Sequence, residues 1–145
     1  MSTGPCEFDR DGIVVRLDMD FPATPAAITP VVDTVLAVVR DQGCAKGKEF
    51  EVETAVREAL ANAIRHGCGS DPTKQVRCCV ACDELHGMLI IVRDPGPGFD
   101  VRNLPDPTMA ENLYSEHGRG IFLINQLMDE VKIERGGTEI RMRMR

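Results

Sequence analysis

A carboxylate and a carboxamide, Glu58 and Asn62, stand four residues apart in the otherwise largely apolar segment 52–65. Side chains at i and i+4 share one face of a helix. An amide oxygen is a hard ligand suited to Mg²⁺, and a carboxylate one turn earlier can accept a proton from an attacking hydroxyl or water. The pair therefore suggests metal-dependent transfer chemistry, and the alternative is an amphipathic helix whose polar side is only solvated.

A second carboxylate, Asp94, ends an apolar strand and opens a turn that contains Gly96 and Gly98. Glycines lack a β-carbon and let a flat group come close, and a carboxylate accepts a hydrogen bond from an exocyclic amine. Adenine has this shape and this amine. The alternative is ordinary turn chemistry that closes a strand.

A third motif, Gly118-Arg119-Gly120, is predicted as a loop that opens a helix with an apolar face. Free amides at a helix N-terminus attract phosphate, and the glycines allow it to approach. Arg119 adds a positive charge. Taken alone, such a loop is also a common way to start any helix.

In their order and spacing the three motifs resemble those of the GHKL superfamily, the ATP-binding fold of gyrase, Hsp90, histidine kinases and MutL. Glu58 and Asn62 lie where the N box has its catalytic acid and its magnesium-binding asparagine. The turn at 94–98 resembles the adenine-binding G1 box, and the segment 118–120 resembles the G2 box. The resemblance implies ATP and Mg²⁺ as cofactors, and it assigns to them Asn62, Asp94, Gly96, Gly98, Gly118, Gly120 and the strand residue Thr138.

Within that superfamily the chain looks most like the small bacterial anti-sigma factor serine kinases. The similarity rests on the short length, on Glu-Ala-Leu-Ala-Asn-Ala at 58–63, on Leu-Pro-Asp-Pro-Thr at 104–108, and on 118–121 followed by Leu-Met-Asp-Glu-Val at 127–131. It extends from about Gly12 to Met144. It implies an ATP-dependent serine kinase that phosphorylates an anti-anti-sigma partner, sequesters a sigma factor and forms a homodimer.

The resemblance also implies a role for each residue in phosphoryl transfer. Asn62 would hold Mg²⁺ across the phosphates, the amides of 118–120 would cradle them, Arg119 would stabilise negative charge, and Glu58 would accept the serine proton. Some members have an arginine just before the G2 glycines, where this chain has Glu116-His117.

Two other functions are considered. One is a nucleotide-dependent switch that sequesters a partner with little or no kinase turnover. The other is a detached sensor histidine kinase domain, which would need an upstream helical hairpin for dimerisation and phosphorylation, and we expect no room for it here.

The expected fold is α+β, a two-layer α/β sandwich of the Bergerat type in which helices cover one face of a mixed sheet. Hydrophobic periodicity predicts helices over 26–42, closed by Gly43, and over 48–66, capped by Gly67. The long unpatterned segment 99–116 is interpreted as an ATP lid. Strands are expected near 11–18, 74–82, 88–93, 130–135 and 138–145.

With 145 residues, the chain is predicted to be a single domain, 1–145. It has 17 Lys and Arg against 23 Asp and Glu, a net charge of -6, which gives nucleic acid no electrostatic support as a partner. No segment is apolar for long enough to span a bilayer, and the N-terminus lacks a signal pattern. A cytoplasmic protein without membrane contact is therefore expected.

Three further residue classes leave alternatives open. Among the six cysteines, Cys79 and Cys82 would face opposite sides of a strand, so free thiols are favoured over a metal site or a disulfide. The last strand alternates apolar residues with Arg141, Arg143 and Arg145, which are interpreted as solvated rather than as a docking patch. The three histidines are interpreted as surface residues: His66, His86 and His117.

Overall fold

The computed structural model describes residues 12–98 and 116–145. Five strands and three α-helices follow one another along the chain in this part of the molecule. They are β1 (Val15–Pro22), α1 (Ile28–Gln42), α2 (Glu49–Asn62), β2 (Gln75–Asp83), β3 (Gly87–Arg93), α3 (Glu116–Leu127), β4 (Glu130–Glu134) and β5 (Glu139–Met144).

The strands form one sheet in the order β1-β2-β3-β5-β4. All four neighbouring pairs are antiparallel, so the prediction of a mixed sheet is wrong in this respect. Two of these pairs, β2 with β3 and β4 with β5, are antiparallel because a short turn joins them and a short connection can only reverse the chain direction. The other two pairs follow from where β1 and the last hairpin enter the sheet. The last hairpin then enters the sheet through β5, which lies beside β3.

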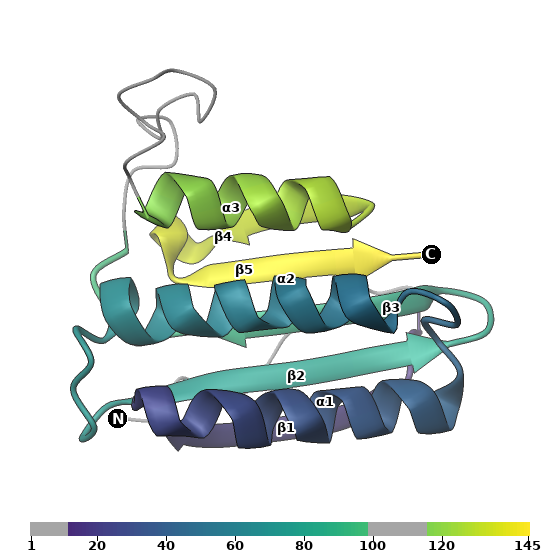
Figure 1. The fold of residues 1–145 in the computed structure, drawn as a ribbon, viewed down its shortest axis with the longest axis horizontal. Coiled ribbons are helices and arrows are strands. Elements are labelled where there is room, and N and C mark those ends of the chain that lie inside the picture. The colour runs from purple at the N-terminus through teal and green to yellow at the C-terminus, as the bar shows by residue number, and fades with distance from the viewer. Residues whose placement is uncertain (1–11, 99–115) are drawn as a thin grey trace.

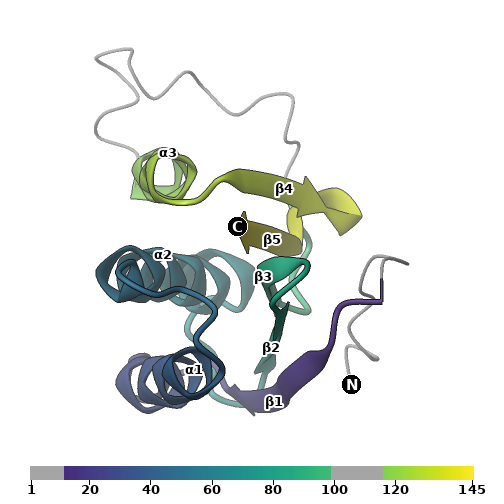
Figure 2. The same ribbon diagram turned by 90° about the vertical axis from the view of Figure 1, so that its right-hand side faces the viewer.

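All three helices lie on one face of the sheet, which confirms the predicted two-layer α+β arrangement (Figure 1). Figure 2 shows the same layers edge-on, with α2 between α1 and α3. Alternation along each strand explains this packing, because Ile90 and Val92 join the core beneath the helices while Leu89 and Ile91 face the other way. None of the helices in the described ranges is both long and apolar enough to cross a bilayer.

Element boundaries differ from the predictions at three places. β1 begins later than expected and runs to Pro22, which is tolerated because β1 is an edge strand. Helix α2 passes directly into a π-helical turn over Ala63–Gly67, so Gly67 is the last residue of that turn instead of a left-handed cap, whereas Gly43 does cap α1 with φ of 67°. The 118–120 segment lies inside the first turns of α3, because that helix already begins at Glu116.

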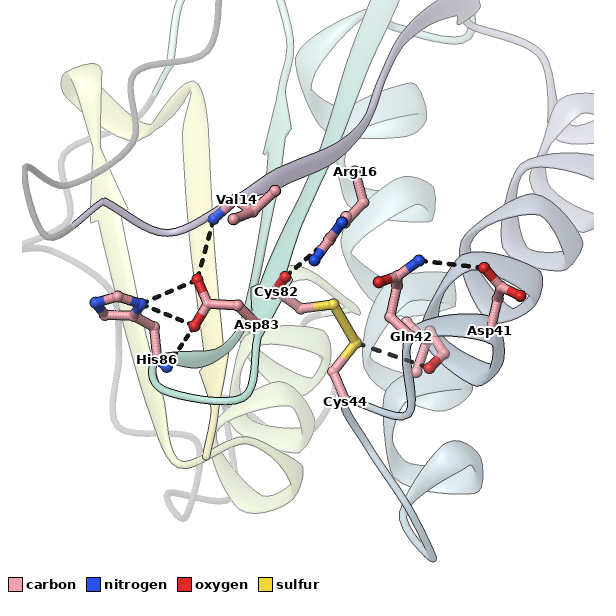
Figure 3. The surroundings of a disulfide bond; sticks show 9 residues. Val14, Arg16, Asp41, Gln42, Cys44, Cys82, Asp83 and His86 are labelled. Atoms are coloured by element: carbon pink, nitrogen blue, oxygen red, sulfur yellow. Dashed lines mark hydrogen bonds and ion pairs between the residues drawn. A yellow bond between two sulfur atoms is a disulfide. The ribbon is translucent and has the colours of Figure 1, made fainter.

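The cysteines correct the expectation of free thiols. Cys44, in the connection between α1 and α2, forms a disulfide with Cys82 near the end of β2, with 6.2 Å between the Cα atoms (Figure 3). Cys79 is disulfide-bonded as well, while Cys68 and Cys78 are buried free thiols. Cys79 and Cys82 do face opposite sides of β2, as predicted. Alternation along a strand identifies the faces but does not reveal a partner 38 residues away.

We expect Cys44→Ala to lower the free energy of unfolding, because the disulfide closes a 38-residue loop in the unfolded chain. The chain-entropy relation gives about 4 kcal/mol for a loop of this size. Urea unfolding of wild type and variant without reductant measures the difference, and the same pair in excess dithiothreitol is the control, in which the gap should nearly close. Equal stability without reductant would show that the bond contributes nothing.

Candidate functional site

A cavity of about 210 Å³ opens where the C-terminal end of α2 meets the end of β3, the start of β5 and helix α3. Residues from both halves of the described chain line it. They are Ala59, Asn62, Ala63, His66, Gly67, Val92, Asp94, Gly98, Ile121, Ile133, Gly137, Thr138 and Ile140. The cavity thus joins Asn62 of the first motif, Asp94 and Gly98 of the second, and residues of the predicted last strand. Helix α3 contributes Ile121, the residue that follows the third motif.

Most of the described residues that line the cavity have an apolar side chain or none, and four have polar side chains: Asn62, His66, Asp94 and Thr138. Val92 and Ile140 come from adjacent strands, where they are direct partners in the β-ladder, and Ile121 faces them from α3. An apolar cavity with a small number of convergent polar groups is typical of a site for a flat small molecule. The polar groups then decide which molecule is accepted.

Of the described residues that line the cavity, Asp94 is the only acidic one. Its Oδ1 accepts a hydrogen bond from the Gly96 amide at 2.8 Å, and its backbone amide donates to the Thr138 carbonyl at 2.9 Å. Among the described residues, no donor reaches its Oδ2. Burial raises the pKa of Asp94 to about 6, although the Gly96 hydrogen bond acts in the opposite direction. Such a half-buried carboxylate is placed to accept a hydrogen bond from a ligand.

The backbone segments around Asp94 are packed so closely that a side chain larger than that of glycine would not fit at several positions. A β-carbon on Gly67 would overlap the Asp94 side chain, and one on Gly96 would overlap the Gly67 carbonyl. Gly98, with φ of 74°, lies against the Gly136 carbonyl in the same way. The π-helical turn ending at Gly67 is therefore packed directly against the start of the 94–98 turn. Larger residues would push the carboxylate out of position.

Glu58 and Asn62 share one face of α2, as their helical spacing predicted, and both lie beside Gly120. A β-carbon on Gly120 would stand 3.1 Å from Glu58 Oε2 and 3.0 Å from Asn62 Nδ2. Because Gly120 has no side chain, α3 can lie close to the face of α2 that carries Glu58 and Asn62. Asn62 lines the cavity, whereas Glu58, one helical turn before Asn62, does not.

These residues fit Mg²⁺ and ATP. Mg²⁺ usually keeps several waters and is held by one or two protein oxygens together with substrate phosphates, so a single amide oxygen such as that of Asn62 would suffice from this wall. Within 12–98 and 116–145, no group of three or more His, Cys, Asp or Glu side chains could hold a metal ion. The apolar wall suits a base, and Asp94 suits its amine.

Of the remaining predicted site residues, Thr138 lies at the cavity, and two others lie in α3. Thr138 lines the cavity, and its hydroxyl donates to the Arg135 carbonyl at 2.8 Å. Gly118 and Arg119 lie in the first turns of α3, but the Arg119 side chain and the lid segment 99–115 lie outside the described structure.

One histidine prediction is confirmed and one needs correction. His66 is exposed, as predicted, and it also lines the cavity, four residues after Asn62. His86 is half-buried, with Nδ1 2.8 Å from Asp83 Oδ1, so it is not a free surface residue (Figure 3). The side chain of His117 is outside the described structure.

Replacing Asp94 should stabilise the empty domain at neutral pH. Because its folded-state pKa is raised from 3.8 to about 6, the folded protein holds this proton more tightly than the unfolded chain does. Stability therefore falls as the pH rises through that window, and the loss is complete at pH 7. We expect Asp94→Asn to raise the melting temperature at pH 7 by on the order of a few °C. The same comparison near pH 3.5 is the control, where the gain should be absent; a lower melting temperature at pH 7 would contradict this view.

Comparison with known proteins agrees with this geometry. The model of the family described as "Histidine kinase-like ATPase domain" matches residues 21–144. The serine-protein kinase RsbW of Bacillus licheniformis is 30% identical over 126 residues, covering 81% of this chain and 77% of that protein. The proteins of the same name from Oceanobacillus iheyensis and Bacillus subtilis are each 29% identical, with the same coverage of both chains.

The family match spans all the described elements from the end of β1 to the end of β5, and the relatives extend over most of the same chain. The resemblance that the three motifs indicated is thereby confirmed. The chain belongs to the histidine kinase-like ATPase family and, within it, to the family of the serine-protein kinase RsbW.

Proposed function

We propose that the protein is an ATP-dependent serine kinase and anti-sigma factor, which phosphorylates a serine of an anti-anti-sigma partner and sequesters a sigma factor. The observation that carries the proposal is the position of Asp94 in an apolar cavity next to Asn62, in a chain whose relatives are named serine-protein kinases. The name of these relatives supports serine kinase activity, and the cavity supports binding of a nucleotide.

The adenine base would lie against Val92 and Ile140, with its exocyclic amine donating to Asp94. Gly96 and Gly98 would keep the edge of the base free of side chains, and Thr138 would border it from β5. A base with a carbonyl at the position of the amine would place two acceptors against each other, which is costly inside an apolar cavity. The site should therefore prefer ATP to GTP.

The phosphates would extend from the base toward the start of α3. Asn62 would hold Mg²⁺ across them, and the Gly118 amide in the first turn of α3 would donate to them at the positive end of the helix. Gly120 would keep this end of α3 free of a side chain. Arg119 would add a fixed positive charge. ATP supplies the phosphoryl group, and the chain supplies position and charge neutralisation.

Glu58 would accept the proton of the attacking serine hydroxyl. Its carboxylate lies next to Gly120, on the same helical stripe as Asn62, so the base and the metal ligand are held by one rigid helix. Glu58 is outside the cavity lining, which leaves room for a protein substrate to approach between it and the phosphates.

The partners follow from the proposed activity. We place the protein in the cytoplasm as a homodimer, where a sigma factor and an anti-anti-sigma protein would compete for it. A switch that binds nucleotide and sequesters its partner with little or no turnover is the alternative, and phosphorylation of a partner separates the two functions.

Two substitutions on α2 should separate nucleotide binding from transfer. Asn62→Ala removes the proposed metal ligand and should abolish the gain in ATP affinity that Mg²⁺ provides. Glu58→Ala should keep ATP binding and slow transfer by about 10²- to 10⁴-fold, or less if the transition state is loose. An ATP titration beside single-turnover phosphorylation of a cognate anti-anti-sigma protein measures both effects.

Glu53→Ala is the matched control for these variants, because Glu53 lies on the same helix and pairs with Arg57 away from the cavity. Transfer at the wild-type rate by Glu58→Ala would remove the assigned base. If the wild-type protein binds ATP but phosphorylates no partner, the sequestration switch becomes the better description.

ATP affinity should also depend on the ionisation of Asp94. At pH 7 the carboxylate is charged, and below its pKa of about 6 a proton competes with the adenine amine, so the dissociation constant should rise by up to about tenfold per pH unit. Asp94→Asn should bind ATP about ten- to a hundred-fold more weakly at pH 7. Calorimetric titrations of both proteins from pH 7.5 to 5 measure this.

The variant controls for protonation of ATP, because the same ligand is used in both series of titrations. Only the difference between the two pH profiles reports on Asp94. Parallel profiles would show that this carboxylate does not contact the base.

A further inference from the structure

A buried ion pair joins β3 to β5 on the sheet face opposite the helices. Arg93 donates to the same oxygen of Glu139 from Nε at 2.9 Å and from a terminal nitrogen at 2.6 Å. Their side chains are only 3% and 4% exposed. Removing two charges from water costs desolvation energy, so a buried ion pair often adds little to the free energy of unfolding. A role of this pair other than stabilising the fold is therefore considered.

The two partners are direct neighbours of the residues around the adenine cavity. Arg93 stands opposite Glu139 in the antiparallel ladder. Asp94 follows Arg93 and Thr138 precedes Glu139, and the Asp94 amide donates to the Thr138 carbonyl at 2.9 Å. The ion pair on one face of the sheet therefore fixes the register of two strand ends whose next residues line the cavity on the other face.

Glu139 also holds the turn that borders the cavity. Its Oε1 is 3.6 Å from Nε of Arg135, the first residue of the 3₁₀ turn Arg135–Gly137. Arg135 has φ of 54°, a left-handed conformation that residues with a β-carbon rarely adopt. The same turn presents the Gly136 carbonyl to Gly98 and accepts the Thr138 hydroxyl at the Arg135 carbonyl.

We infer that Glu139, with Arg93 and Arg135, positions the adenine-binding groups of the cavity, and that this cluster thereby sets the preference for ATP over other nucleotides. Glu139 is a positioning residue, since its side chain lies on the sheet face opposite the cavity. Arg141 also donates to Glu139, to Oε2 at 3.3 Å, so this carboxylate is restrained through both oxygens. The inference rests on the proposed nucleotide site and deepens it.

The test uses Arg93→Lys, which keeps the positive charge but loses the planar fork that donates twice to Glu139. Arg77→Lys is a closely matched control. Arg77 is the ladder partner of Arg93 on β2, and it forms a two-bond fork with Asp18, at 2.8 and 2.7 Å, one strand farther from the cavity. Melting temperatures and dissociation constants for ATP and GTP are measured with Mg²⁺ on the full chain.

We expect Arg93→Lys to remain folded, to bind ATP about three- to tenfold more weakly than wild type, and to lose a similar part of its preference for ATP over GTP. Arg77→Lys should keep both the affinity and the preference. A purely structural ion pair would lower the melting temperature of Arg93→Lys without changing the ATP to GTP ratio, and that result would overturn the inference.

Arg135→Gln provides a second test that does not disturb the buried pair, because the Arg135 side chain is 43% exposed. It should lower ATP affinity about twofold to threefold, since it releases the turn that packs on Gly98. Lys132→Gln on β4 is its control, with a similarly exposed side chain that pairs with Glu130. Equal ATP affinity in these two variants would count against the inference. Absence of ATP binding by the wild type would instead refute the proposed function itself.

Discussion

The pairing of β3 with β5 is the interaction on which the cavity depends. It joins Val92 to Ile140 on the helix side and Arg93 to Glu139 on the other side. Asp94 directly follows β3 and Thr138 directly precedes β5, and a backbone hydrogen bond links the two residues. Helix α2 and its π-helical turn then close over this edge, where Gly67 meets Asp94. Each wall of the cavity is thus positioned relative to two strand ends with a single fixed register.

Much of this arrangement was predictable from sequence because its signals are local. Helical spacing placed Glu58 and Asn62 on one stripe, and both lie beside Gly120. The apolar strand that stops at Asp94 ends at the cavity, and strand alternation assigned Ile140, Met142 and Met144 to the core face. The family resemblance added the nucleotide, which periodicity alone could not supply. Together they located the α+β fold and the three motifs.

The features that escaped prediction depend on partners far away in sequence. Cys44 and Cys82 meet only because α1 ends above β2, and nothing near either cysteine indicates the other. Arg141, interpreted as solvated, is 11% exposed because Glu139 lies beside it on the same face. The direction of strand pairing likewise follows from where the last hairpin inserts. Alternation tells which face a residue occupies but not what covers that face.

The cavity also lies at a seam between two parts of the chain. One wall belongs to α2 and β3, and the other to α3 and the hairpin of β4 and β5. In the described structure, that hairpin is attached to the rest of the sheet only through β5. A ligand that contacts both walls can bind only while the β4–β5 hairpin is docked on the rest of the sheet. Binding therefore stabilises the docked hairpin against local unfolding. Slower amide hydrogen exchange along β5 would then report that the cavity is occupied.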